Sequence, residues 1–329
     1  MTLQIVRDAV WLDHSLPNPF LRKVGRPRIP VSCVLVGLAL SCIIVGVMMR
    51  RAGIGVSIAN TGFGLSAFAL GTLAALRIAA HRPATLGQYR LRDFSEHMFL
   101  FVVTCLLGVF ATYPAAAATV GFTDPMLARM DSALHFDWIA MYRVVLEYPM
   151  LRTASSIAYS MIYVSPIILM AAFAWTHRAD EAREFLITFW LGAMLTVLLF
   201  MRLPAEGPLA FLWHGPIPYM PTSALYQEQM IPALRDHSLR AIDMTALRGL
   251  VCAPSFHTVS AVLYMAAAWP IARLRWPMIA INVAMLLATP IEGTHYLVDM
   301  IAGLFVAVMA IVLVKAGLRL LHQYEVRTA

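Results

Sequence analysis

Eight apolar runs, each about as long as a helix that crosses a bilayer, constrain this chain more than any other feature. A hydrocarbon core about 30 Å thick takes about 20 helical residues, and in lipid a helix satisfies its own backbone hydrogen bonds. The runs cover residues 31–49, 54–76, 98–118, 153–176, 185–201, 255–272, 276–291 and 295–314. The sequence therefore predicts an all-α integral membrane protein with about eight transmembrane helices.

The composition supports this interpretation, because 60% of the residues are hydrophobic and only 13% are charged, against roughly 45–50% and about 25% in soluble globular proteins. The formal charge is +7, but the cations lie in short segments between the apolar runs. That pattern sets the orientation of a membrane protein and does not indicate a nucleic-acid partner. With a cytoplasmic N-terminus, 16 cations fall on the cytoplasmic side and 9 on the other. We therefore expect both termini to be cytoplasmic. The four cysteines indicate neither a disulfide nor a cysteine-based metal site.

Two connecting segments are long enough to have structure of their own. Residues 121–152 have an amphipathic helical pattern with Trp138, Tyr142 and Tyr148 as expected interfacial aromatics, so we expect this segment to lie on the membrane. Residues 203–254 carry seven prolines and include a helical pattern at 238–248. A long, proline-punctuated loop is typical of a lid or a binding loop.

Ionisable residues at the ends of the apolar runs are the first candidates for function, because such groups are costly at membrane depth. Arg202 ends the fifth run, His257 begins the sixth, and His295 and Asp299 begin the eighth. The spacing of four residues predicts that His295 and Asp299 share one helix face. Since successive runs cross in opposite directions, all four residues are expected on the same side of the membrane, which is extracytoplasmic in the orientation given above.

Two histidines, an aspartate and an arginine at one depth suit phosphoryl transfer. One imidazole attacks phosphorus, the carboxylate fixes the tautomer of that imidazole, and the second imidazole protonates the leaving oxygen. The guanidinium neutralises the phosphoryl oxygens. This chemistry requires neither a metal nor a cofactor, and we expect neither.

At these residues the chain resembles the type 2 phosphatidic acid phosphatase superfamily of lipid phosphatases and phosphotransferases. The superfamily signature reads K-x6-R-P, then P-S-G-H, then S-R-x5-H-x3-D. The second and third motifs are matched at Pro254, Ser255, His257, His295 and Asp299. The third motif has the form H-Y-x2-D, with Tyr296 after the histidine, and is closest to the sphingolipid synthase and inositolphosphotransferase branch.

The chain also departs from the signature. Leu195 replaces the first-motif lysine, Leu203 separates Arg202 from Pro204, Phe256 replaces the glycine, and Thr289 replaces the third-motif arginine. Two expected phosphate-binding cations are therefore missing. Arg248, near the end of the long loop, is our candidate for one of them.

The resemblance extends from about Met98 to the C-terminus and implies a core of six helices. We therefore divide the chain into a two-helix extension at 1–93 and a catalytic core at 94–329, which contains the extracytoplasmic loop 203–254.

The resemblance also implies roles for single residues. His295 would be the nucleophile that forms a phosphohistidine, Asp299 its orienting partner and His257 the general acid. Arg202 would bind phosphate, and Ser255 is a further candidate phosphate ligand.

Each of these residues also has a structural interpretation. His295 and Asp299 would then be a hydrogen-bonded pair that holds two helices together, and Arg202 would extend to the interface. Ser255 would be a helix N-cap, and Arg248 a solvated cation.

Two other functional classes stay open beside the enzyme. Buried ionisable groups in a bundle of eight spans also suit a transporter, although the charges cluster at one face and no inverted repeat is visible. An intramembrane zinc enzyme would use both histidines and Asp299, although the chain has no H-E-x-x-H helix.

The sequence therefore predicts an enzyme that acts on membrane lipid phosphate esters, with transfer to a lipid or polyol hydroxyl favoured and plain hydrolysis as the alternative. We expect it in a bacterial inner membrane, with the active site on the extracytoplasmic side.

Overall fold

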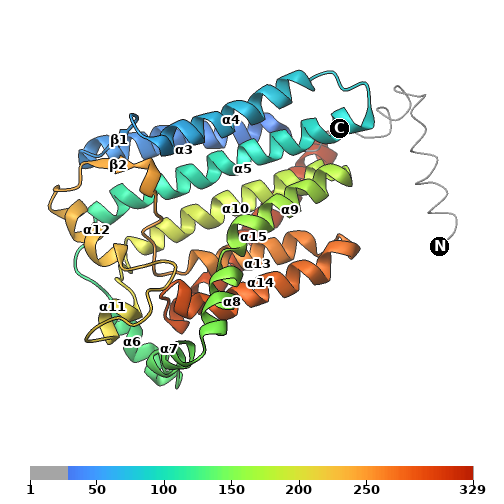
Figure 1. Cartoon of the computed structure of the whole chain (residues 1–329). Coiled ribbons are helices and arrows are strands. Elements are labelled where there is room, and N and C mark those ends of the chain that lie inside the picture. Colours follow the sequence, from blue (N-terminus) through green and yellow to red (C-terminus); the bar gives the residue numbers. More distant parts are fainter. Residues whose placement is uncertain (1–28, 329) are drawn as a thin grey trace.

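The computed structural model describes residues 29–328 and confirms a helical membrane architecture (Figure 1). Residues 1–28 and 329 lie outside the described range, and with them the start of the predicted extension and the cations counted there. The bundle is built from α3 (Val31–Ala52), α4 (Thr61–Ala79), α5 (Leu86–Ala117), α8 (Pro149–Tyr159), α9 (Met161–Trp175), α10 (Ala179–Phe200), α13 (Phe256–Ala268), α14 (Ala272–Glu292) and α15 (Leu297–Thr328). The connecting elements are α6 (Asp124–Ala133), α7 (Trp138–Glu147), α11 (Pro208–Leu212), α12 (Tyr226–Arg235), the 3₁₀ helix η1 (Met244–Ala246), β1 (Gly55–Ser57) and β2 (Ala241–Asp243).

Six helices within residues 29–328 are long and apolar enough to cross a membrane, namely α3, α4, α5, α10, α14 and α15. Helices α8 and α9 are long and apolar enough only when taken together, and they meet at a bend of 41°, which fits either a broken seventh span or a re-entrant segment. The sixth predicted run is shorter than expected, because α13 has 13 residues, or about 20 Å at 1.5 Å per residue. Pro270 follows closely and has no amide hydrogen with which to continue the helix. The seventh run is longer than expected, since α14 begins at Ala272 and has 21 residues.

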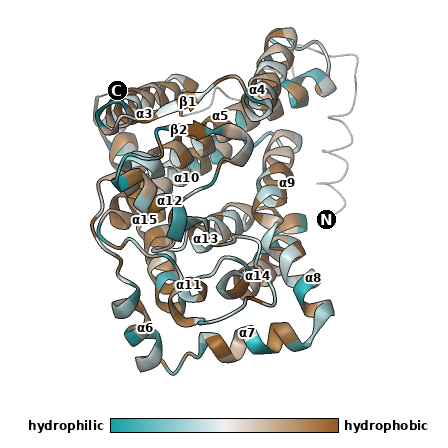
Figure 2. Ribbon diagram, turned by 60° about the vertical axis from the view of Figure 1, so that its left-hand side comes forward, coloured by the Kyte–Doolittle hydropathy of each residue, from teal (hydrophilic) through white to brown (hydrophobic). Residues whose placement is uncertain are grey.

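The long helices lie side by side (Figure 1), and most of their residues are hydrophobic (Figure 2). Helices α3 and α4 pack against α5, α5 packs against α10, and α13 packs against both α14 and α15. At the end of the bundle away from the short helices, Glu96 accepts hydrogen bonds from Arg77 at 2.9 Å and Arg183 at 2.6 Å, which joins α4, α5 and α10. Outward-facing side chains such as Ile43 and Phe68 are exposed, as expected where lipid is the solvent.

The short elements gather at the other end of the bundle (Figure 1), where α6 and α12 carry more hydrophilic residues than the long helices (Figure 2). The amphipathic segment forms α6 and α7, but the prediction that Trp138 and Tyr142 lie at the membrane interface is wrong. Both are buried, because the Trp138 indole donates to the Pro290 carbonyl and the Tyr142 hydroxyl to the Tyr219 carbonyl.

The predicted helix at 238–248 is also wrong. This segment contains β2 and the single turn η1, and β2 pairs in parallel with β1 from the connection between α3 and α4. The central residue of β2, Ile242, is buried in the same apolar cluster as Ile54. This burial and the hydrogen bonds between β1 and β2 favour a strand here over the helix that the sequence pattern indicated. The long loop is thereby joined to the N-terminal helices.

Candidate functional site

His295 and Asp299 form the centre of the candidate site. The His295 Nδ1 atom lies 3.3 Å from the Asp299 Oδ2 atom, and both residues are buried. His295 does not lie on the helix, as the spacing predicted, but in the turn between α14 and α15, while Asp299 is in the first turn of α15. The Asp299 Oδ2 atom also accepts from the Tyr296 amide at 3.1 Å. Since Asp299 engages Nδ1, the Nε2 atom is the free nitrogen of this imidazole.

Two carboxylates of α6 hold the turn that carries His295. Asp131 accepts from the Leu297 and Val298 amides, both at 2.9 Å, and so satisfies the first free amides of α15. Burial raises the pKa of Asp131, and these two amide hydrogen bonds partly offset the rise. Asp124 accepts from the Tyr296 hydroxyl at 3.0 Å. These bonds join the turn to α6.

His257 is the second residue of α13 and faces His295, with the two ring centroids 6.1 Å apart. Ser255 precedes it as the N-cap and accepts from the Thr258 amide at 3.5 Å, which is the capping interpretation of this serine. The Ser255 amide donates to the Asp299 carbonyl at 3.0 Å. The starts of α13 and α15 are therefore joined, and the convergence of both histidines on one site is observed.

The two candidate arginines differ in position. Arg248 lies beside the cavity that both histidines line, with its guanidinium carbon 5.9 Å from the ring centroid of Tyr226. Arg202 follows α10, and its exposed side chain is not among the described residues that line this cavity.

The cavity has a volume of about 510 Å³ and runs away from the histidines between α5, α9, α10 and α13. Along α5 its lining extends from Met98 to Thr112, a length of about 21 Å at 1.5 Å per residue. Polar side chains gather near the Thr112 end, where the Thr112 hydroxyl accepts from the Leu250 amide of the long loop. The cavity therefore has a polar end and a longer, mainly apolar part, which matches the two parts of an amphiphile.

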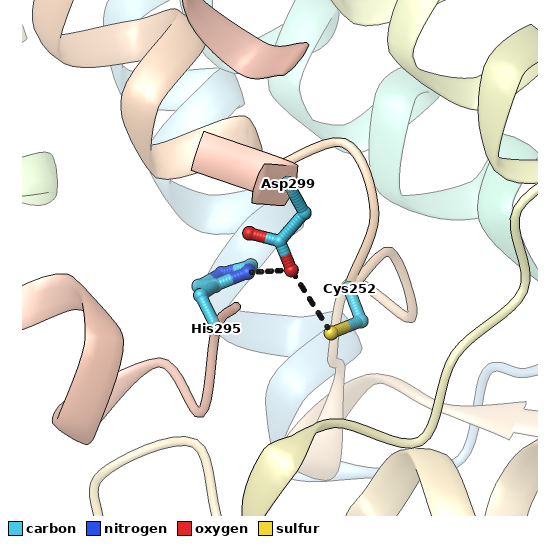
Figure 3. Close-up of side chains that lie close together, drawn as sticks. All are labelled: Cys252, His295 and Asp299. Carbon is cyan, nitrogen blue, oxygen red and sulfur yellow. Dashed lines mark hydrogen bonds and ion pairs between the residues drawn. The ribbon is translucent and has the colours of Figure 1, made fainter. Parts of the chain in front are cut away.

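Three potential metal-ligating groups lie together in the same place (Figure 3). Ligand atoms of Cys252, His295 and Asp299 lie within 4.8 Å of one another, and the Cys252 Sγ atom is 3.7 Å from the Asp299 Oδ2 atom. Burial, followed by the negative charge of Asp299, raises the pKa of the Cys252 thiol well above its ordinary value. Metals bind the thiolate, so a metal at this place would have to displace the thiol proton.

Two residues of the site were missed by the sequence reasoning. Tyr159, the last residue of α8, stacks on His257 with ring centroids 4.1 Å apart. Glu292 is buried three residues before His295 and accepts from the hydroxyls of Ser155, Tyr219 and Thr222. Neither residue belongs to a motif with a recognisable spacing in the sequence. The only available signal was the position of Glu292 three residues before His295.

Comparison of the chain with curated proteins and with solved structures gives no match. A family model described as the PAP2 superfamily matches residues 125–313, which is more than half of the chain and includes both histidines, Asp299 and the whole long loop. The paired histidines, the orienting carboxylate and the amphiphile-shaped cavity agree with that match, and the chain belongs to the PAP2 superfamily, whose membership indicates an enzyme of the lipid phosphatase type.

Proposed function

We propose that this protein is a lipid phosphotransferase or phosphatase that acts on lipid phosphate esters through a phosphohistidine on His295. The observation that carries the proposal is the cavity, which is lined by His257 and His295 together with a mainly apolar wall that follows α5 for about 21 Å. A lipid chain fits such a wall, and its phosphate would then lie between the two imidazoles.

The proposed reaction has two steps. In the first, the Nε2 atom of His295 attacks phosphorus, a phosphorus–nitrogen bond forms, and the phosphorus–oxygen ester bond breaks as the leaving oxygen takes a proton from His257. In the second, water or an alcohol attacks phosphorus, gives its proton to His257, and breaks the phosphorus–nitrogen bond. Asp299 at 3.3 Å holds His295 in the tautomer that leaves Nε2 free to attack.

Phosphate binding requires a cation near the two histidines. Arg248 is the proposed ligand because it lines the same cavity as the two histidines and belongs to the long loop, several of whose residues also line that cavity. Arg202 and Ser255 stay as further proposed ligands. Ser255 has its hydroxyl engaged in capping α13, and Arg202 would need to turn its exposed side chain inward.

Transfer to an alcohol is the favoured outcome, as in the sphingolipid synthase and inositolphosphotransferase branch that the H-Y-x2-D motif resembles. The long loop supports it, since Thr222, Ser223 and Gln227 line the cavity beside the histidines, and a covered intermediate excludes competing water. Gln227 is buried, and its side-chain carbonyl has no hydrogen-bond partner among the described residues. It is therefore placed to accept from a hydroxyl in the cavity. Plain hydrolysis is the second candidate, because the same histidines serve water equally well.

Two further parts of the proposal concern placement. We propose that residues 94–329 form the catalytic core and 1–93 an extension, and that the site faces the extracytoplasmic side of a bacterial inner membrane. Ser238→Cys tests the sidedness, because Ser238 is exposed in the long loop. An impermeant thiol reagent should label this variant in intact cells, with the wild-type protein as the control for its four native cysteines.

The function is tested with purified protein, a long-chain lipid phosphate and a series of acceptor alcohols. We expect acid-labile labelling of the wild-type protein by a lipid with radioactive phosphate, none in His295→Ala, and a phosphorylated alcohol among the products. Release of free phosphate alone, whatever alcohol is supplied, would favour hydrolysis. Turnover by His295→Ala would exclude the phosphohistidine.

A further inference from the structure

The connection between α3 and α4 is paired with the long loop through backbone hydrogen bonds. Strand β1 (Gly55–Ser57) runs parallel to β2 (Ala241–Asp243) at one end of the bundle (Figure 1). The Gly55 amide also donates to the Arg240 carbonyl at 2.8 Å. Since β1 belongs to the extension, this pairing joins the extension to the loop that carries Arg248.

A side-chain pair continues this contact beyond the strands. The Asn60 Nδ2 atom donates to the Asp243 Oδ1 atom at 2.8 Å. Asn60 is also the N-cap of α4, because its Oδ1 atom accepts from the Phe63 amide. Asp243 caps η1 in the same way by accepting from the Thr245 amide. One hydrogen bond therefore links the two residues that begin α4 and η1.

The first turn of α4 also lies directly against η1. The Gly62 amide donates to the Thr245 hydroxyl at 3.2 Å. A side-chain carbon at position 62 would lie 2.3 Å from the Met244 carbonyl carbon and oxygen, so only glycine fits there. These are backbone atoms, which cannot turn away as the end of a flexible side chain can. A larger residue at position 62 must therefore displace η1 from α4.

The segment held in this way leads directly to the cavity. Helix η1 ends at Ala246, and Leu247 and Arg248 follow it and line the cavity. The Arg248 amide donates to the Tyr113 hydroxyl of α5 at 3.3 Å. The backbone that presents Arg248 is thus held by α5 at this residue and by the extension just before it. Among the described residues 29–93, none lines the cavity, so the extension can act on a substrate only through the elements that it contacts.

We propose that the extension positions the phosphate ligand Arg248, with Asn60 and Gly62 as the residues that hold η1 in place. This assignment rests on the proposed function, in which Arg248 binds the phosphate. Both positioning residues precede residues 125–313, the part of the chain that matches the superfamily model, so family membership gives them no role.

The expected effect of the extension is on the affinity for lipid phosphate. An arginine side chain loses conformational freedom when it binds a ligand, and a backbone that is already fixed lowers this cost. The chemical step occurs on His295, which belongs to another part of the chain. A disturbed contact between α4 and η1 should therefore raise KM and leave kcat nearly unchanged.

The test is Gly62→Ala, assayed with a long-chain lipid phosphate in detergent micelles. We expect KM to rise about tenfold, as for the loss of a hydrogen bond to a charged group, and kcat to stay within about twofold of the wild-type value. Gly64→Ala is the matched control, because it makes the same change in α4 where a side-chain carbon meets no atom within 4 Å. It should have the wild-type KM and kcat.

A second measurement combines Gly62→Ala with Arg248→Ala. If the extension acts through Arg248, Gly62→Ala causes no further rise in KM when Arg248 is already absent. Additive losses in the double variant, a fall in kcat with KM unchanged, or a wild-type KM in folded Gly62→Ala would each overturn the inference.

Asn60→Asp tests the same contact without added volume, and so decides the matter if Gly62→Ala does not fold. Aspartate keeps the N-cap of α4 but places two carboxylates together, so KM should rise. Adding Asp243→Asn to this variant restores a donor opposite an acceptor and should return KM to within about twofold of the wild-type value. A KM that stays raised in the double variant would contradict the proposed contact.

The same assays separate this inference from the proposed function. Wild-type turnover with a KM that Arg248→Ala does not change would show that Arg248 is not the phosphate ligand, and would overturn the inference alone. No turnover of lipid phosphate by the wild-type protein would refute the proposed function itself.

Discussion

Gly293→Ala is the substitution whose consequence follows most directly from the structure. Gly293 ends α14 with φ −91° and ψ −7°, which is ordinary helical backbone, so alanine is not excluded by conformation. It is excluded by space, because the new carbon would lie 2.5 Å from the His295 Cδ2 atom and 2.8 Å from the Thr289 carbonyl oxygen. Carbon atoms in contact normally keep about 3.5–4.0 Å apart. The His295 ring must therefore move by about 1 Å.

A shift of that size has two measurable effects. Misplacement of a reacting group by about 1 Å costs on the order of 100-fold in rate, so we expect kcat for a lipid phosphate to fall by about that factor. An extra methyl group in a packed region destabilises by about 1–3 kcal/mol, which leaves the protein folded at assay temperature.

The assay is turnover of a long-chain lipid phosphate in detergent micelles, with thermal unfolding measured on the same preparations. Gly317→Ala is the matched control, since a side-chain carbon there meets no atom within 4 Å. It should retain wild-type turnover. Turnover of Gly293→Ala within about twofold of the wild-type value, in a protein that stays folded, would refute the reasoning. It would show that the reaction rate does not depend on the close fit of the His295 ring against the end of α14.

Three further predictions concern the charges of the site. Asp299→Asn should retain measurable turnover with a loss of about 10²–10⁴-fold, because it perturbs the orientation of His295 without removing it; a loss as complete as that of His295→Ala would contradict this. Arg248→Lys should raise KM about tenfold, since an ammonium cannot bind phosphate oxygens bidentately, and parallel kinetics of Arg202→Lys show which arginine binds the phosphate. Dialysis against EDTA should leave kcat unchanged, and a loss that zinc restores would instead indicate a metal on Cys252, His295 and Asp299.

The membrane class and the convergence of the histidines could be predicted from the sequence because both depend on the order of apolar runs. An apolar run of about 20 residues has few alternatives to a membrane helix, and the direction of each crossing follows from its number in the chain. His257 and His295 therefore had to arrive at the same face, and their rings lie 6.1 Å apart.

The contacts within that face could not be predicted, because they join segments that are far apart in the sequence. Asp124 accepts from the Glu206 and Gly207 amides at 3.0 and 2.9 Å, although the residues are more than 80 positions apart. Nothing in the local pattern distinguishes Asp124 from a solvated carboxylate at a helix start. Trp138 was misassigned for the same reason, since a tryptophan in an amphipathic helix has the same pattern whether it faces lipid headgroups or a neighbouring helix.

Glu292 connects the long loop to the turn that carries His295. Its buried carboxylate accepts from Tyr219 and Thr222 of the loop and from Ser155 of α8, and its backbone carbonyl accepts from the Ser223 amide at 2.9 Å. Lifting the loop would remove these donors from a buried carboxylate, which costs at least about 1–3 kcal/mol for each group left unpaired. The turn with His295 begins at the next residue, so the loop and His295 are ordered together. The cavity also reaches α9, where Tyr163 and Ile167 are both lining and exposed. We therefore expect a lipid chain to enter from the bilayer beside α9 while the loop stays closed.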